Sequence, residues 1–119
     1  MKGHHSKSLL ILLASFSSLA AESENRLFYD AVRAEATGDL DSAINSYEDS
    51  AKIAHSANLH GNLANLYFKK ERLGKSVLNY RKALVLEPDN RDLYENLSFA
   101  METARVESTG LDISSGYFR

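Results

Sequence analysis

A single proline and the two periodic apolar segments before it constrain this chain more than any other feature. Pro88 is the only proline among 119 residues. Before it, apolar residues recur at the three- and four-residue spacing of one helix face in residues 60–70 and again in residues 75–87. A short turn, residues 71–74, separates the two segments. Proline lacks an N–H and keeps the preceding residue out of helical geometry, so it ends the second helix. Residues 60–90 are therefore predicted to form a helical hairpin.

The hairpin recurs 33 residues earlier in a less regular form, with Tyr47 matching Tyr80. Gly38 makes the turn, since glycine ends a helix in left-handed geometry without a Cβ penalty. An inner helix is expected at about residues 24–37 and an outer helix at about residues 40–54. Both tyrosines are expected to fill the wedge between neighbouring hairpins.

A third segment, residues 91–106, matches the first helix of the hairpin and has no second helix after it. Ser56 and either Asp89 or Asn90 are expected to cap the helices that follow them. Residues 107–119 have no helical period and are expected to form a flexible tail. The alternative is a tail whose apolar residues fold back onto the unpaired face of the last helix.

The second hairpin resembles the tetratricopeptide (TPR) repeat, in which small residues, aromatics and a proline stand at fixed points of a 34-residue pattern. The matching residues are Leu63, Ala64, Tyr67, Ser76, Tyr80, Ala83, Leu84 and Pro88. The resemblance implies an all-α fold, a short α-solenoid of about two and a half TPR hairpins and five helices, in residues 21–106. It also implies close helix contacts at small residues, namely Ala31, Ala43, Ala64, Ser76 and Ala83. TPRs often carry glycine at the position of Glu71, so this glutamate is expected to be left-handed.

A narrower resemblance covers about residues 62–97. This stretch is similar to the TPR component of bacterial aerotolerance operons. In that family, membrane-spanning and SH3-like segments commonly follow the repeats, and neither is found in this sequence.

The N-terminus is typical of a secretory signal peptide, residues 1–20, which would precede the repeats as a helix. Lys2 and Lys7 supply the positive charge, residues 9–14 begin the apolar run, and Ser18-Leu19-Ala20 offers the small residues that a signal peptidase needs. Cleavage is expected after Ala20, with Ala21 as the alternative. The protein is therefore predicted to be exported to the periplasm or cell envelope. An uncleaved leader, which would associate the protein with a membrane, is the alternative.

Composition and motifs argue against several classes of function. The sequence contains no cysteine, which excludes disulfides, thiolate metal sites and cysteine nucleophiles. Its net charge of −2 argues against general nucleic-acid binding. No phosphate-binding loop, nucleophile elbow or zinc spacing is found, so no enzymatic activity, cofactor or small-molecule substrate is expected. A metal pair of His55 and His60 is less favoured than two polar surface residues.

Six residues on the inner helices are predicted to contact a partner protein, because the inner helices of TPRs line the concave face. They are Asn58, Asn62, Asn65, Phe68, Lys69 and Phe99. Asparagine amides can donate and accept hydrogen bonds to a peptide main chain, and phenylalanine offers flat apolar contact. TPRs that bind a C-terminal carboxylate need cations where this chain has Asp92 and Asn96, so that ligand is not expected. The alternative is that Asn65 only contacts solvent and Phe99 packs between helices.

The function predicted from these features is a protein–protein interaction scaffold that binds an extended segment or helix of a partner in the concave groove. The alternative is a self-assembling structural or accessory subunit of a membrane-associated complex, which would form homo-oligomers. A basic block at residues 69–82 is either a solvated face or a docking patch for an acidic partner. Asn65→Ala is expected to weaken binding without changing the melting temperature.

Overall fold

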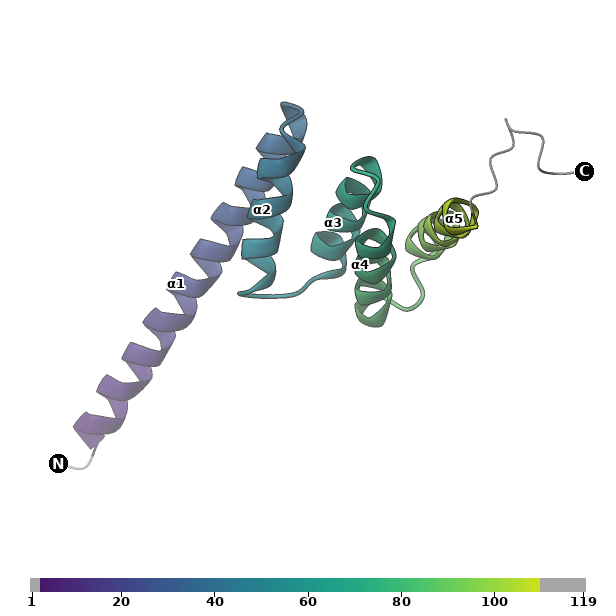
Figure 1. Ribbon diagram of the computed structural model, residues 1–119. Helices are drawn as coiled ribbons and strands as arrows, with labels where there is room; N and C mark the ends of the chain where they lie inside the picture. Colours follow the sequence, from purple (N-terminus) through teal and green to yellow (C-terminus); the bar gives the residue numbers. More distant parts are fainter. Residues whose placement is uncertain (1–2, 110–119) are drawn as a thin grey trace, which may run out of the picture. The chain divides into compact units, whose positions relative to one another are not determined.

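The chain is helical throughout the part that the structure describes. The computed structural model describes the backbone of residues 3–109 and the side chains of residues 18–109. Within residues 3–109 there are five α-helices and no strand (Figure 1). The helices are α1 (Gly3–Ala36), α2 (Leu40–Ala51), α3 (Ala57–Lys69), α4 (Leu73–Leu86) and α5 (Arg91–Ser108). The predicted all-α class is confirmed.

Helix α1 includes most of the predicted leader and the first inner helix in one continuous stretch, Gly3–Ala36. Export and cleavage of the leader stay predictions. In the part of the chain that the structure describes, no helix is both long enough and apolar enough to cross a bilayer.

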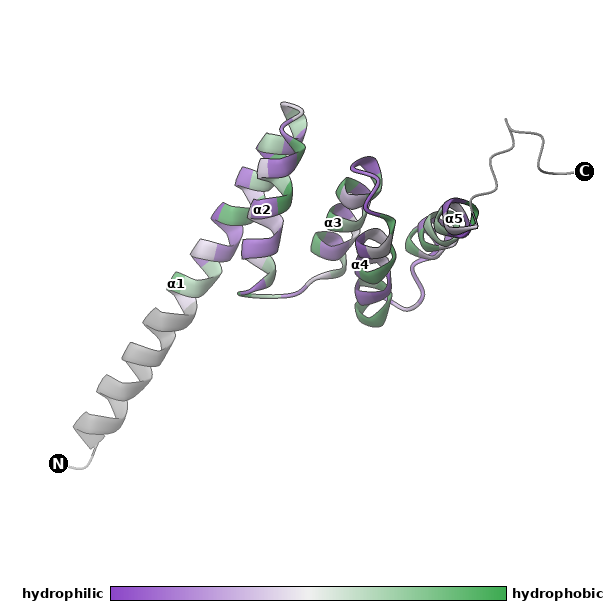
Figure 2. Ribbon diagram, in the orientation of Figure 1, coloured by the Kyte–Doolittle hydropathy of each residue, from purple (hydrophilic) through white to green (hydrophobic). Residues whose placement is uncertain are grey.

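The helices divide into two compact units, residues 1–54 and residues 55–119. In the first unit α1 packs against α2, and in the second α4 packs against both α3 and α5. Figure 2 shows hydrophobic and hydrophilic residues on each of the helices α2 to α5, as expected for helices that bury one side. The core of the first unit includes the buried residues Ala31, Ala43, Ile44 and Tyr47. The core of the second is built around Ala64, Tyr80, Leu97 and Ala100, with Phe68, Val77, Leu84 and Leu93 packed against them.

Small residues mark the places where helices come close. Ala64 and Ser76 are fully buried, and the Ser76 hydroxyl donates to the carbonyl oxygen of Ala64 at 2.8 Å. This bond joins α3 directly to α4, so a longer side chain at either position would push the two helices apart. Ala31, Ala43 and Ala83 are equally buried. The expectation for these five small residues is confirmed.

Three helices begin at a side chain that accepts a hydrogen bond from the first turn. Ser56 Oγ accepts from the N–H of Leu59 at 3.0 Å, and Asn90 Oδ1 accepts from the N–H of Leu93 at 3.1 Å. Of the two predicted caps for the last helix, Asn90 is therefore the one used. Asp39 caps α2 in the same way, and its hydrogen bonds with Ser42 lower the pKa of its carboxyl.

Several predicted boundaries are wrong by a few residues. Helix α2 ends at Ala51, because the N–H groups of the next two residues bond three residues back and tighten the last turn. Helix α4 begins already at Leu73, so the turn is residues 70–72.

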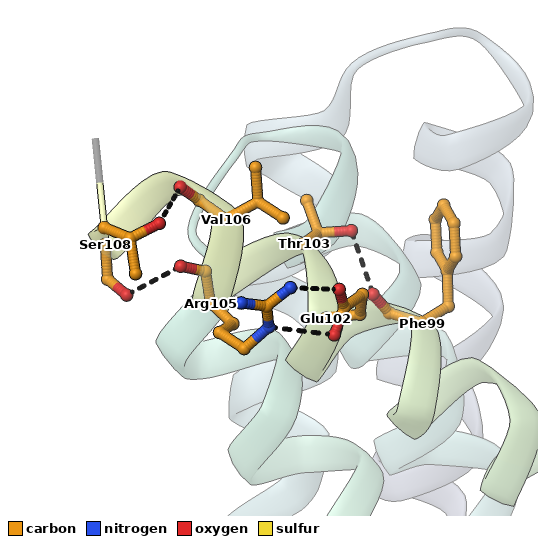
Figure 3. Close-up of polar contacts among 7 residues, drawn as sticks. Phe99, Glu102, Thr103, Arg105, Val106 and Ser108 are labelled. Atoms are coloured by element: carbon orange, nitrogen blue, oxygen red, sulfur yellow. Dashed lines mark hydrogen bonds and ion pairs between the residues drawn. The ribbon is translucent and has the colours of Figure 1, made fainter. Parts of the chain in front are cut away.

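Helix α5 also runs past its predicted end, to Ser108. In its last turn the Ser108 hydroxyl donates to the carbonyl oxygen of Arg105 at 3.0 Å, and the Arg105 side chain pairs with Glu102 (Figure 3). A carbonyl of the last turn is thus satisfied without a further turn of helix. Residues 110–119 of the predicted tail lie outside the described residues.

Both hairpin turns have the same hydrogen-bond pattern around a left-handed residue. Glu71 has a φ of +60°; its N–H donates to the Phe68 carbonyl at 3.0 Å, and the Arg72 N–H donates to the Tyr67 carbonyl at 2.8 Å. This pair of bonds is the Schellman motif. Gly38, with a φ of +82°, has the same two bonds at 3.0 and 2.9 Å. The predicted left-handed geometry of Glu71 is confirmed.

Glu71→Gly is expected to raise the free energy of unfolding by about 1 kcal/mol, because an L-residue in left-handed geometry costs roughly 1–2 kcal/mol that glycine avoids. Gly38→Ala makes the reverse change, from glycine to an L-residue, at the corresponding position of the first hairpin turn. An added Cβ at Gly38 meets nothing within 4 Å, so only the left-handed backbone geometry opposes it. The free energy of unfolding is therefore expected to fall by a similar amount. Urea unfolding followed by circular dichroism measures both. A destabilised Glu71→Gly variant would contradict this account of the turn.

Candidate functional site

A cavity of about 330 Å³ lies where α3, the loop after α4 and the start of α5 meet. Ten residues line it, and half of them are asparagines: Asn58, Asn62, Asn65, Asn90 and Asn96. Each amide carries both donors and an acceptor, so the surface can satisfy polar groups of either kind. The cavity is open to solvent and lies entirely within the second unit.

Glycine at position 61 makes room for this cavity. Gly61 is buried on the side of α3 that faces α5, and a Cβ placed there would lie 3.1 Å from Leu93 Cδ2. Any side chain at Gly61 would therefore press on Leu93 and fill space that both residues now line.

Glu87 is the only charged residue among those that line the cavity. Its side chain is exposed, and Oε2 accepts a hydrogen bond from Asn90 Nδ2 at 2.8 Å. The other lining residues are neutral amides, small residues, Leu93 and Tyr80. The cavity is thus polar and carries a single negative charge.

Asn65 has a structural bond that the sequence did not reveal. The Tyr80 hydroxyl donates to Asn65 Oδ1, and burial raises the pKa of Tyr80, so the hydroxyl stays protonated near neutral pH. The idea that Asn65 only contacts solvent is therefore wrong. Removing its amide also removes the partner of a buried tyrosine, so we expect Asn65→Ala to lower stability as well, and it is not a clean probe of binding.

Two phenylalanines lie further along α3 and α5. The ring centroids of Phe68 and Phe99 are 5.5 Å apart, and Phe68 packs on the core of the second unit. Phe99 is 65% exposed, and in Figure 3 its ring points away from the Glu102–Arg105 pair. Phe99 is thus an exposed aromatic surface held in place by Phe68 and is not a buried core residue.

The predicted site residues fall into two groups. Asn58, Asn62 and Asn65 line the cavity, whereas Phe68, Lys69 and Phe99 do not. On α5, Leu93 and Asn96 line it. The sequence alone did not indicate that Glu87, Asn90 and Leu93 line the cavity. A signal was present, since Pro88 and the Asn90 cap fix where the loop turns back toward α3.

His55 and His60 belong to a hydrogen-bonded chain that also includes Asn79. Asn79 Nδ2 donates to the Lys75 carbonyl at 2.9 Å, so Asn79 Oδ1 is free to accept from His60 Nδ1 at 3.0 Å. His60 Nε2 then accepts from His55 Nδ1 at 2.8 Å. His60 is only 2% exposed, so the expectation of polar surface is wrong for it. In the described part of the chain no three His, Cys, Asp or Glu residues lie close enough to hold a metal.

Comparison with known proteins agrees with the helical hairpins. Residues 64–103 match the family described as TPR repeat, which supports a TPR repeat protein. The matched stretch covers the second half of α3, all of α4 and most of α5. No curated protein matches the chain. The likeness to the aerotolerance component stays a prediction.

Proposed function

We propose that this TPR repeat protein is an interaction scaffold of the cell envelope that binds an extended segment of a partner protein in the groove between α3 and α5. TPR repeats generally mediate protein–protein interactions and are generally not enzymes. The single observation that carries the proposal is the convergence of five asparagines on one cavity. The envelope location is inferred from the N-terminal sequence alone.

The chemistry of the groove favours an extended segment over a helix. An extended main chain presents free N–H and C=O groups along its length, whereas a helix has already paired most of them. Asn58 and Asn96 are exposed, and their side-chain amides make no hydrogen bond to the rest of the described chain. Both can therefore bond to a ligand without giving up a contact that holds the fold.

The test uses peptides selected from a phage-displayed random library on the immobilised full-length protein. For the tightest peptide, the Asn58→Ala, Asn96→Ala double variant is expected to weaken binding by about 1–3 kcal/mol, since each loss leaves a ligand group without a partner. Fluorescence polarisation measures the affinity. The melting temperature is expected to stay the same.

Asn45→Ala is the control, because Asn45 is an exposed helical asparagine of α2, outside the groove. It should leave affinity unchanged. If the double variant binds as tightly as the original protein, the interface lies elsewhere, and the basic block at residues 69–82 becomes the next surface to test.

Self-assembly is the second candidate, and one surface favours it. Tyr94 and Met101 of α5 are exposed large apolar residues, and with Leu97 they line a shallow hollow on the same helix. A second copy could cover this face. Light scattering on the eluting protein distinguishes the two candidates: a monomer at high micromolar concentration counts against assembly, and a dimer that Met101→Glu dissociates supports it.

A further inference from the structure

We propose that the groove recognises a positive charge on its ligand at Glu87 and an apolar side chain at Phe99. The ligand would be an extended segment with a lysine, an arginine or a free α-amino group at the loop end of the groove. This inference rests on the proposed function of the groove and specifies the partner that it would take.

The Glu87 carboxylate is available for such a contact. Within the described residues no lysine or arginine pairs with it, and its one side-chain partner is the neutral amide of Asn90. Some other exposed carboxylates are paired inside their own helices, as Asp30 is with Arg33 at 2.7 Å and Glu102 with Arg105 at 2.6 Å. Glu87 can therefore pair with a cation from outside without losing an internal one.

The surroundings of Glu87 do not cancel its charge. The lining of the cavity is otherwise neutral. Three exposed charged residues follow Glu87 in the loop and the first turn of α5, namely Asp89, Arg91 and Asp92, and together they add one further negative charge. A ligand with a positive group is thus attracted to this end, and one with a carboxylate is repelled from it.

Beyond the cavity, further along α3 and α5, the surface differs in character. Phe99 offers an exposed ring, backed by Phe68 at a centroid distance of 5.5 Å. Phe68 lies ten residues along α3 from Asn58, which lines the same cavity as Glu87. At the rise of a helix those ten residues span about 15 Å, a distance that an extended chain covers in about four or five residues. The positive and apolar groups of the ligand are therefore expected at that spacing.

The experiment uses the same phage-displayed library of random twelve-residue peptides on the full-length protein. Selected peptides are expected to carry lysine or arginine about four or five residues from an aromatic or large aliphatic residue. With a synthetic copy of the best peptide, Glu87→Gln should weaken binding at least tenfold. Replacing the cationic residue of the peptide by glutamine should cost the same factor on the original protein and almost nothing further on Glu87→Gln. Acetylating the peptide distinguishes a free α-amino group from a side chain.

Glu95→Gln is the matched control, since Glu95 is an exposed glutamate of α5 that does not line the cavity. It should change affinity less than twofold. The inference is overturned if the selected peptides lack a cation or if Glu87→Gln binds them as well as the original protein does. In that case a loss of binding in the Asn58→Ala, Asn96→Ala variant would still support the groove. If that variant also binds normally, the groove itself is not the binding site.

Discussion

Tyr80→Ala is expected to lower the free energy of unfolding of the second unit by about 3–5 kcal/mol, the range for removing a large aromatic side chain from a core. Tyr80 is only 4% exposed and packs against Ala64 of α3 and Leu97 and Ala100 of α5. Its removal would leave a void where three helices meet. Small domains are stable by only about 5–15 kcal/mol, so this single change would remove much of the stability. Urea unfolding of the full chain, followed by circular dichroism, measures it.

Tyr80→Phe is the control, because it removes only the hydroxyl that donates to Asn65. Its expected cost is about 0.5–1.5 kcal/mol, the net value of one hydrogen bond. The original protein and the Tyr80→Phe variant should also differ in how their stability changes at alkaline pH. Burial raises the pKa of Tyr80. The stability that the protonated hydroxyl contributes is therefore complete below the pKa of the unfolded state, about 10, and is lost as the pH rises through the pKa of the folded state. Tyr80→Phe has no hydroxyl to ionise, so it should lose less stability than the original protein in that pH range. Equal costs for the Ala and Phe variants at neutral pH would show that the ring does not stabilise the core.

Tyr47→Ala is expected to have an effect of the same size, about 3–5 kcal/mol, in the first unit. Tyr47 is fully buried on α2, and its ring meets the edge of Phe28 on α1 at a centroid distance of 5.4 Å. Its hydroxyl also donates to Glu35 at 3.4 Å. The ring therefore joins the two helices of the first hairpin. Hydrogen exchange of the backbone amides in α2, monitored by mass spectrometry, should become markedly faster.

Tyr29→Ala provides the comparison within the same hairpin. Tyr29 also contacts the Phe28 ring, with a centroid distance of 6.2 Å, but it is 64% exposed where Tyr47 is 0% exposed. Its loss should leave exchange in α2 almost unchanged, because little buried area is removed. Similar exchange rates in the two variants would mean that Tyr47 does not hold the hairpin together.

The elements that the sequence predicted well depend on local signals. Pro88 and the spacing of apolar residues located α4, which ends at Leu86. The caps Ser56 and Asn90 followed from their chemistry at a helix start, whereas the left-handed position of Glu71 was implied by the resemblance to TPRs, which often carry glycine there. The proline, the apolar spacing and the caps each act over a short stretch of the chain, so the sequence alone is enough to find them.

The features that the sequence did not predict depend on contacts between side chains that are far apart along the chain. His60 was taken for surface because nothing in its own segment shows that Asn79, on the next helix, accepts its hydrogen bond. Asn65 and Tyr80 are 15 residues apart, and their bond depends on how α3 and α4 pack. The cavity needs α3, the loop and α5 at once, so Glu87 could not be assigned to it from spacing alone.

Tyr80 belongs to the hydrophobic core and also lines the cavity. Occupying the cavity and keeping the helices packed are therefore thermodynamically linked, since a ligand that binds only the folded state shifts the folding equilibrium toward it. At a free concentration one hundred times its dissociation constant, such a ligand adds about 2.7 kcal/mol, comparable to the loss of one core side chain. With the proposed partner bound, this protein would gain resistance to proteolysis. Its abundance in the cell would then follow the supply of that partner.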